Sequence, residues 1–324
     1  MFVLPFEIKK APFDVSIRDK VVLMGSCFSE NIGKKLSDHK FNVLINPFGV
    51  IYNPISIFKT LDQSISTQVS EDRIVEIDHI YYHWDAHSAL SAASREDLIK
   101  KLHEQQDLTR SALHKSSTLI LSPGTSWVYH HQSNHSIVAN CHKVPQKEFT
   151  KSLLSGEEIT RHYFEVIEKV RSINPQINVI LTVSPVRHIR DGLVENNLSK
   201  SILIQAVQEI VKRDQKASYF PSYEILIDVL RDYRFYKEDM IHPSDQGIEY
   251  IWQKFKSAYF DQETLNFIEE WEKLTRALKH RPFHPGSPAH QSFLKSTAKR
   301  LQSFSSIVNV EEELKSIEKQ LLDA

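Results

Sequence analysis

The stretch KVVLMGSCFSENIGKKL, residues 20–36, decides how the chain is expected to fold. Its first part is a short apolar run that ends at Gly25, and a helical pattern begins directly after Ser26. A continuous apolar run of this length is typical of a strand that is covered on both faces, as in a parallel sheet. We therefore predict a buried strand that ends in a tight turn at Gly25 and leads into a helix.

Other parts of the chain repeat this pattern. The further predicted strands are TLILSPG (118–124), INVILTVSP (177–185) and FNVLIN (41–46), and EILIDVL (224–230) fits either a strand or a short helix. Helical patterns separate the strands, and one opens with a capping box formed by Ser155 and Glu158. Alternating strands and helices predict a three-layer αβα sandwich around a mainly parallel sheet, with ligands beyond the carboxyl ends of its strands.

Three segments do not follow this alternation of apolar strands and amphipathic helices. Residues 68–84 alternate like a hairpin, and residues 126–144 look like a second insertion of short strands. After about Phe260 the chain becomes charged and amphipathic, with a Pro-, Ser- and His-rich connector at residues 282–292. We predict a domain of residues 1–260 and a helical extension of residues 261–324, which packs on the domain or serves self-association.

Composition narrows the class of protein. The 324 residues are 41% hydrophobic and 25% charged, with a net charge of -1. No excess of positive charge favours nucleic acid or a membrane surface, so we expect a small-molecule partner. The two cysteines, Cys27 and Cys141, are too few for a disulfide framework. With no pattern of a secretory signal at the N-terminus, we expect a cytoplasmic location.

Two motifs carry candidate chemistry. Ser26 follows a strand at a helix N-terminus, where unpaired N–H groups can stabilise an oxyanion, although a plain helix cap looks the same. Asp239 and His242 stand three residues apart, and a histidine oriented by a carboxylate can take the proton of a serine hydroxyl. His242 can also simply decorate a helix start. Cys27 is an alternative nucleophile or a small buried side chain.

Together these motifs resemble a known family. A serine at the end of the first strand and a C-terminal D-x-x-H resemble the SGNH (GDSL-like) hydrolases, and GSCFSE resembles the signature of the GSCFA-domain family within that group. Similar blocks extend over roughly residues 6–260, whereas the tail resembles no family. The blocks are NPFGVIYNP (46–54), GTSWVY (124–129), ANCHKVP (139–145), SPVRH (184–188), YFPSYEI (219–225) and DYRFYKEDMIHPS (232–244).

The resemblance implies a flavodoxin-like, SGNH-type sheet and ester-bond chemistry through an acyl-enzyme. In that scheme Ser26 is the nucleophile, His242 is the general base and Asp239 orients it. The same resemblance implies a protein that acts on a small acylated substrate, carbohydrate or other, as an esterase or acyltransferase.

The oxyanion hole is where the chain departs from that pattern. The resemblance implies donors at Ser26, at Gly49 and at the Asn of a G-x-N-D motif, but this chain has Ser126 in the Asn position. Because the loss of one donor typically costs about a hundredfold or more in turnover, either another group compensates or the activity is weak or different. Candidates are Thr125, Ser126 and Asn46.

Further polar side chains near the predicted strand ends are candidates for substrate binding, although surface loops look similar. They are Asn46, Trp127, Asn140, His142, Arg187 and His188. Arg187 suits a carboxylate or phosphate, and His142 suits the leaving group. Among the sixteen histidines, the cluster at 130, 131, 135 and 142 raises the question of a metal. Neighbouring residues of a strand point to opposite faces and no H-E-x-x-H spacing exists, so we expect neither metal nor cofactor.

Two alternatives to an enzyme stay open. One is a non-catalytic ligand-binding module that keeps the SGNH fold with a degenerate oxyanion hole, as Ser126 suggests. The other is a scaffold that acts through its helical tail.

Overall fold

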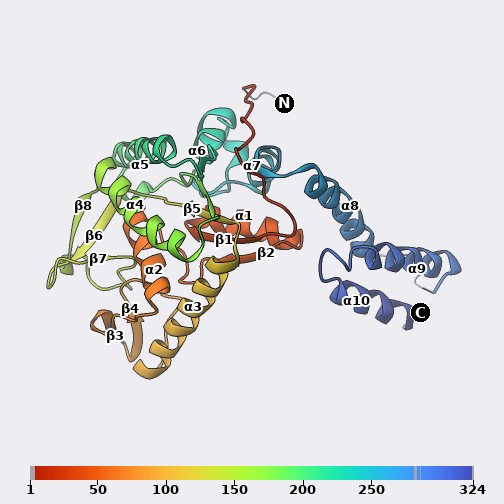
Figure 1. Cartoon of the computed structure of the whole chain (residues 1–324), viewed down its shortest axis with the longest axis horizontal. Coiled ribbons are helices and arrows are strands. Elements are labelled where there is room, and N and C mark those ends of the chain that lie inside the picture. The colour runs from red at the N-terminus through yellow and green to blue at the C-terminus, as the bar shows by residue number, and fades with distance from the viewer. Residues whose placement is uncertain (1–3, 281–282, 285, 323–324) are drawn as a thin grey trace.

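A five-stranded sheet lies at the centre of the computed structural model, which describes residues 4–280, 283–284 and 286–322 (Figure 1). Its strands, in spatial order, are β10 (Ala217–Tyr219), β9 (Asn178–Leu181), β5 (Thr118–Ser122), β1 (Lys20–Gly25) and β2 (Asn42–Ile45). All neighbouring pairs are parallel. The order is flavodoxin-like, with the switch point between β1 and β5, so the predicted fold class is confirmed.

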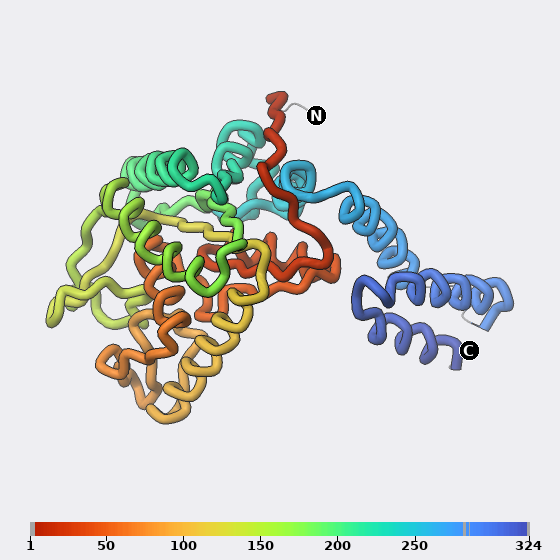
Figure 2. Tube along the Cα trace, viewed as in Figure 1, coloured from red at the N-terminus to blue at the C-terminus, as the bar shows by residue number. Residues whose placement is uncertain are grey.

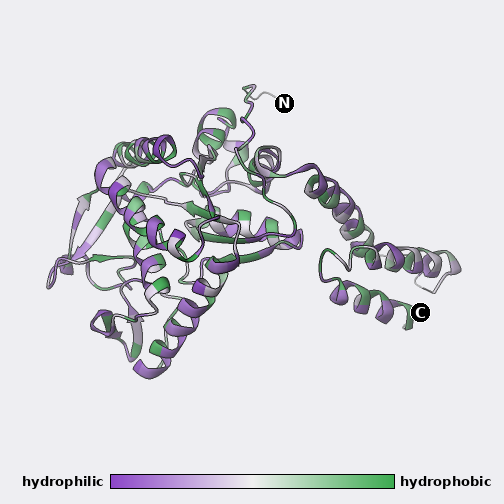
Figure 3. Ribbon diagram, viewed as in Figure 1, coloured by the Kyte–Doolittle hydropathy of each residue, from purple (hydrophilic) through white to green (hydrophobic). Residues whose placement is uncertain are grey.

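Helices cover both faces of the sheet. The helices are α1 (Cys27–Asp38), α2 (Pro54–Ser66), α3 (Arg95–Lys115), α4 (Gly156–Ile173), α5 (Leu193–Arg213), α6 (Ser222–Glu224), α7 (Asp245–Tyr259), α8 (Gln262–Lys279), α9 (Pro288–Gln302) and α10 (Glu311–Leu322). Successive β1 side chains alternate between two cores: Val21 and Leu23 pack with α1 and α7, and Val22 and Met24 pack with α2 to α5. The apolar strands and amphipathic helices are visible in Figure 3.

Local signals in the sequence account for several element boundaries. The capping box before α4 forms as predicted, with Ser155 and Glu158 bonded to each other's backbone N–H groups. The ambiguous segment 224–230 is helical, since α6 continues into a π-helical turn at Ile225–Val229. The fifth strand is instead the short β10, which the sequence did not indicate. The connector is shorter than predicted, because α9 begins at Pro288, and part of it lies outside the described residues.

Both insertions are sheets, as the sequence predicts. The first is the hairpin of β3 (Ile74–Ile77) and β4 (Ile80–His83), and the second contains β6 (Trp127–His131), β7 (Ile137–Val138) and β8 (Phe149–Leu153). Short helical turns accompany them at η1 (Glu71–Arg73) and η2 (Gln146–Glu148), and two more lie elsewhere in the domain, η3 (Ile189–Asp191) after β9 and η5 (Tyr233–Phe235) before α7.

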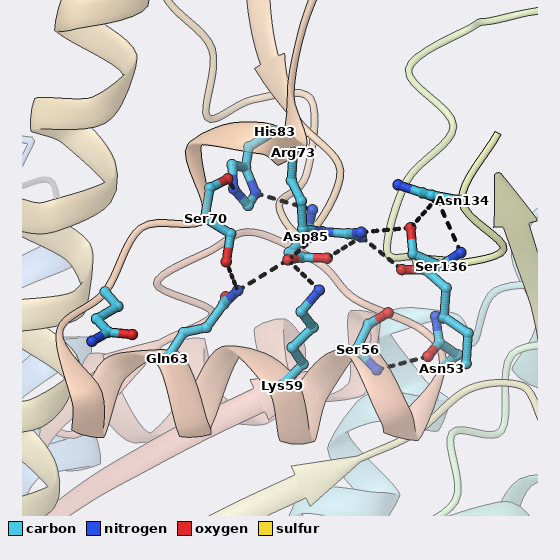
Figure 4. Close-up of polar contacts among 12 residues, drawn as sticks. Asn53, Ser56, Lys59, Gln63, Ser70, Arg73, His83, Asp85, Asn134 and Ser136 are labelled. Atoms are coloured by element: carbon cyan, nitrogen blue, oxygen red, sulfur yellow. Dashed lines mark hydrogen bonds and ion pairs between the residues drawn. The ribbon is translucent and has the colours of Figure 1, made fainter.

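A buried ion pair joins the two insertions to the domain (Figure 4). Arg73 beside the hairpin binds Asp85 and also donates to Ser136 and the Ile137 carbonyl in the second insertion. Lys59 of α2 binds the same carboxylate at 2.8 Å. Burial alone would raise the pKa of Asp85, but Arg73 and Lys59 lower it, so the carboxylate stays charged. This cluster is structural, because each of its charges already has a partner.

The helical tail packs on the edge of the domain. In Figure 2 the chain leaves α7 and runs outward through α8, after which α9 and α10 lie side by side. Trp271 donates its indole N–H to the Asp38 carbonyl at 3.0 Å, and Lys40 pairs with Glu313 at 2.7 Å. The apolar residues of the tail join the core that contains α1 and α7. No helix in the described part of the chain is both long and apolar enough to span a bilayer.

Candidate active site

The turn after β1 brings Ser26 to the switch point of the sheet. Gly25 has φ +140°, and a Cβ at this position would lie 2.5 Å from the carbonyl oxygen of Ser122. Only glycine fits so close to the end of β5. Ser26 then caps α1, since its hydroxyl accepts a hydrogen bond from the N–H of Phe28 at 3.3 Å. Ser26 therefore does act as a helix cap, which the sequence analysis left open as an alternative. This role is compatible with a chemical role for the same hydroxyl.

Ser26 lies within a buried group of hydroxyls. Its side chain is 1% exposed, and its Oγ is 3.2 Å from Ser122 Oγ, which in turn lies 2.7 Å from Ser29 Oγ. The neighbouring Cys27 is half-buried, and burial raises the pKa of its thiol. A protonated thiol is a weak nucleophile, so the environment disfavours Cys27 as a rival to Ser26.

Asp239 and His242 form a hydrogen-bonded pair on the loop before α7. His242 Nδ1 lies 2.7 Å from Asp239 Oδ2, and the other carboxylate oxygen accepts from the N–H groups of Ile241 and His242. These hydrogen bonds, with the backbone N–H of His242 first, lower the pKa of Asp239 to about 2. A charged acceptor at Nδ1 keeps the proton there and leaves Nε2 as the basic nitrogen. The imidazole is 40% exposed.

The loop that carries this pair lies over the start of α1. Pro243 lines one small cavity together with Phe28 and Asn31 of α1. Arg187, after β9, donates to the Met240 carbonyl at 3.2 Å and lies over the ring of Tyr236. Within the described residues, no hydrogen bond joins Ser26 Oγ to His242. The two predicted halves of the triad thus lie toward the same end of the sheet without a hydrogen bond between Ser26 and His242 in the described part of the chain.

All four N–H groups expected in the oxyanion hole have acceptors within the protein. Ser26 N–H donates to the Ser122 carbonyl at 2.9 Å, and Gly49 N–H to the Asn46 carbonyl at 2.7 Å. Thr125 N–H and Ser126 N–H donate to the Tyr52 carbonyl and to Ser199 Oγ, respectively; the Ser126 hydroxyl also donates to Ser199. Ser126 therefore does not replace the expected Asn as a free donor.

The side-chain amide of Asn46, unlike these four N–H groups, has a donor without an acceptor among the described residues. Its Oδ1 accepts from the N–H of Gly25 at 2.9 Å, while its buried Nδ2 has no partner among the described residues. An unsatisfied buried donor is costly and often marks a site where a further group binds. The sequence-based list of compensating groups included Asn46, and this amide is the member of that list with an unused donor.

Five of the predicted site residues share a cavity of about 620 Å³ between the sheet and the second insertion. They are Thr125, Trp127, Asn140, His142 and His188. Tyr52 also lines it and connects it to the serine: a Cβ on Gly124 would lie 3.3 Å from Tyr52 Cδ1 and 3.6 Å from Ser26 Cβ. The lining does not include Ser26, Asn46, Arg187 or His242.

His142 is held as a structural residue at the edge of this cavity. Its Nε2 lies 2.9 Å from the His83 carbonyl and its Nδ1 lies 2.9 Å from Ser88 Oγ. A carbonyl accepts only from N–H, so Nε2 carries the proton and Nδ1 accepts from the serine. Burial, with a smaller effect of the nearby histidines, lowers the pKa of His142 to about 4. The predicted contact with a leaving group has no ring nitrogen left to make it.

Other groups at the site gave no clear signal in the sequence. Ser122 follows an apolar strand and looks like an ordinary strand end, yet it contacts Ser26. Lys200 of α5 is buried and donates to the carbonyls of Gly124 and Ser184 at 2.5 and 2.6 Å. Burial lowers the pKa of Lys200 to about 7. Lysine at a helical position normally indicates solvent, so the sequence could not reveal this link between two strand ends.

No group of three or more His, Cys, Asp or Glu side chains suited to a metal ion occurs in residues 4–280, 283–284 and 286–322. The histidines of the second insertion instead make local contacts. His130 binds Ser152 Oγ at 2.8 Å, and His131 binds Ser133 Oγ at 2.8 Å.

Comparison with protein families decides the membership of the chain. The model of the GSCFA family matches residues 20–255. The chain belongs to the GSCFA family. A second model, described as the C-terminal domain of GSCFA domain proteins, matches residues 271–323. The tail is therefore also characteristic of GSCFA proteins, which corrects the expectation that it resembles no family.

Solved structures similar to this GSCFA protein are distant. One is provisionally described as a platelet activating factor from Streptococcus pneumonia, with 13% identity, a TM-score of 0.42, and coverage of 73% of this chain and 82% of that one. Another is a carbohydrate esterase family 3 protein from Talaromyces cellulolyticus, with 8% identity, a TM-score of 0.37, and coverage of 78% and 99%. The comparison with curated proteins gives no match.

Proposed function

We propose that this protein is a serine esterase or acyltransferase of the SGNH type, with Ser26 as nucleophile and the His242–Asp239 pair as its base. The observation that carries the proposal is the 2.7 Å contact between Asp239 and His242 Nδ1, at the end of the sheet where Ser26 lies. The contact holds the imidazole in the tautomer that a general base requires. The strand order and the order of the three residues along the chain fit the SGNH pattern.

In the proposed reaction Ser26 Oγ forms a bond to the carbonyl carbon of an ester while its proton moves to His242 Nε2. The tetrahedral intermediate then expels the alkoxide, which takes that proton from the imidazole. Water or an acceptor alcohol then attacks the acyl carbon while its proton moves to His242. The bond between the acyl carbon and Ser26 Oγ breaks, the acid or new ester leaves, and Oγ takes the proton back from His242. The buried Nδ2 of Asn46 is our candidate for the donor that the Ser126 position lacks.

The proposal requires a local rearrangement when substrate binds. Ser26 must leave Ser122 and approach His242, whose side chain is exposed and so has room to move. Catalytic hydrogen bonds are often long in the absence of substrate and shorten in the complex. The hydrogen bond from Arg187 to the Met240 carbonyl ties the loop that carries His242 to the segment after β9.

Hydrolysis of short p-nitrophenyl esters tests the proposal. We expect activity in the wild-type protein, and its loss by at least about a thousandfold in Ser26→Ala and His242→Ala. Cys27→Ala is the matched control, because it alters the adjacent side chain and should retain activity. Equal hydrolysis by all four proteins, or none by the wild type, would reject the esterase.

A second candidate function is a ligand-binding module without catalysis. The burial of Ser26 and the internal acceptors of all four expected oxyanion donors favour it. A module predicts tight binding in the 620 Å³ cavity with no covalent labelling of Ser26 by a fluorophosphonate. Labelling would favour the enzyme.

A further inference from the structure

The cavity beside Ser26 has an apolar interior with an aromatic wall. Trp127, Tyr129 and Phe149 of the second insertion line it together with Tyr52, Val138 and Val144. Its buried polar groups are neutral: burial raises the pKa of Cys141 to about 11 and lowers the pKa of His188. An interior of this kind suits a hydrocarbon or aromatic group of a ligand.

The structure describes every residue that lines this cavity. Among these residues, the only charged side chains are cationic. They are Lys143 and Arg190. No Asp or Glu lines the cavity, although the Asp191 carboxylate lies 3.9 Å from Nδ1 of the lining His188. Neither cation has an ion pair or a side-chain hydrogen bond in the described part of the chain. The nearby Lys151 differs, because Asp191 binds it at 2.5 Å and it lies over the face of Trp127.

The backbone that presents Lys143 is held in an uncommon conformation. His142 and Lys143 have φ of +48° and +63°, in the left-handed region that non-glycine residues seldom occupy. Asn140 Oδ1 accepts the N–H of His142 at 2.8 Å, and the buried ring of His142 fixes the turn. Strain of this kind is kept where the surrounding structure enforces it, often at ligand sites.

We propose that this cavity binds a ligand with an apolar body and an anionic oxygen group, a carboxylate or a phosphate, with the anion held by Lys143 and Arg190. The proposal rests on the proposed function in one respect, since it identifies the substrate as an anionic ester whose apolar part lies beside Tyr52. Exposed arginine and lysine donors that line a largely apolar cavity favour such an anion over a neutral ligand of the same shape.

Calorimetric binding of non-hydrolysable probes tests the site independently of catalysis. We expect 4-phenylbutyrate to bind the wild-type protein more tightly than 4-phenylbutan-1-ol, and Lys143→Ala and Arg190→Ala each to weaken the binding of the acid about five- to tenfold. Lys147→Ala removes an exposed lysine of the same insertion that does not line the cavity, and should have no effect. Phenyl phosphate in place of the acid shows which anion the site prefers.

Equal binding of acid and alcohol, no binding of either, or equal affinities in all variants would overturn the proposal. Hydrolysis of p-nitrophenyl hemisuccinate relative to p-nitrophenyl butyrate then separates the two claims. If the probes bind as expected but neither ester is hydrolysed, the esterase fails and the anion site stands. If both esters are hydrolysed without preference for the anionic one and the probes do not discriminate, the esterase stands and the anion site fails.

Discussion

The loops that carry His242 and His142 both meet the candidate site, but they hold their histidines in opposite ways. His242 has one partner, Asp239, and an exposed edge. His142 has partners on both nitrogens, stacks on Tyr82 with ring centroids 4.9 Å apart, and lies 5.5 Å from the tilted ring of Trp84. The difference supports the proposal that His242, which has an unused nitrogen, is the reactive histidine, and it assigns a structural role to His142, both of whose nitrogens are bonded.

Replacement of His242 should have the largest effect on activity. His242→Gln removes the proposed general base, so we expect kcat/KM for a p-nitrophenyl ester to fall about a thousandfold or more. The free energy of unfolding, measured in urea, should stay within about 0.5 kcal/mol of the wild type because the side chain is exposed. The matched control His79→Gln alters an exposed histidine of the hairpin and should leave both quantities unchanged. A large loss of stability in His242→Gln would instead show that His242 is a structural residue, as His142 is.

Replacement of His142 should act mainly on stability. His142→Ala removes a buried ring, leaves the His83 carbonyl without its donor, and leaves the Ser88 hydroxyl with only the long contact to Asn140 Oδ1 at 3.4 Å. We expect the free energy of unfolding to fall by about 2–4 kcal/mol in urea titrations. A change below about 0.5 kcal/mol would show that His142 is not a structural residue.

The low pKa of His142 predicts how stability depends on pH. The pKa is about 4 in the folded state and roughly 6.5 in an unfolded chain, so the unfolded state binds more protons between these values. Stability should therefore fall as the pH falls from about 6.5 to 4, by roughly 3 kcal/mol at most from this residue. The variant His142→Phe keeps an aromatic ring without a titrating group and should show a shallower slope. Identical slopes would contradict the assignment.

The smallest expected effect is the loss of stability on replacing Ser88, whose hydroxyl donates to Nδ1 of His142 and so fixes its tautomer. Ser88→Ala removes the hydroxyl that donates to Nδ1, at a cost of about 1 kcal/mol in the free energy of unfolding. In the His142→Ala background the same substitution should cost less, since the partner is already absent. Equal costs in both backgrounds would show that the two side chains are not coupled.

Local patterns predicted much of the fold. Continuous apolar runs found four of the five strands of the central sheet, and the capping box at Ser155 found the start of α4. The short strand β10 was not predicted, because a strand of three residues that includes the polar Ser218 shows no periodic pattern of apolar residues. The D-x-x-H spacing correctly placed Asp239 next to His242, because three residues of loop suffice to bring them together.

The roles of other site residues depend on contacts across the sequence. Ser126 resembles a replacement for a catalytic Asn until Ser199, which is 73 residues away, binds its N–H and hydroxyl. His142 resembles a substrate contact until His83, 59 residues away, accepts its proton. The spacing of residues along the chain does not reveal such distant partners. Sequence patterns therefore indicated which residues lie near the site, but not which of them have a polar atom without a partner.

Mass-spectrometric mapping of a fluorophosphonate adduct tests the central claim most directly. The account predicts a single adduct on Ser26 of the wild-type protein, none in Ser26→Ala, and much slower labelling in His242→Gln. An adduct on another residue, no adduct at all, or equal labelling rates with and without His242 would contradict it.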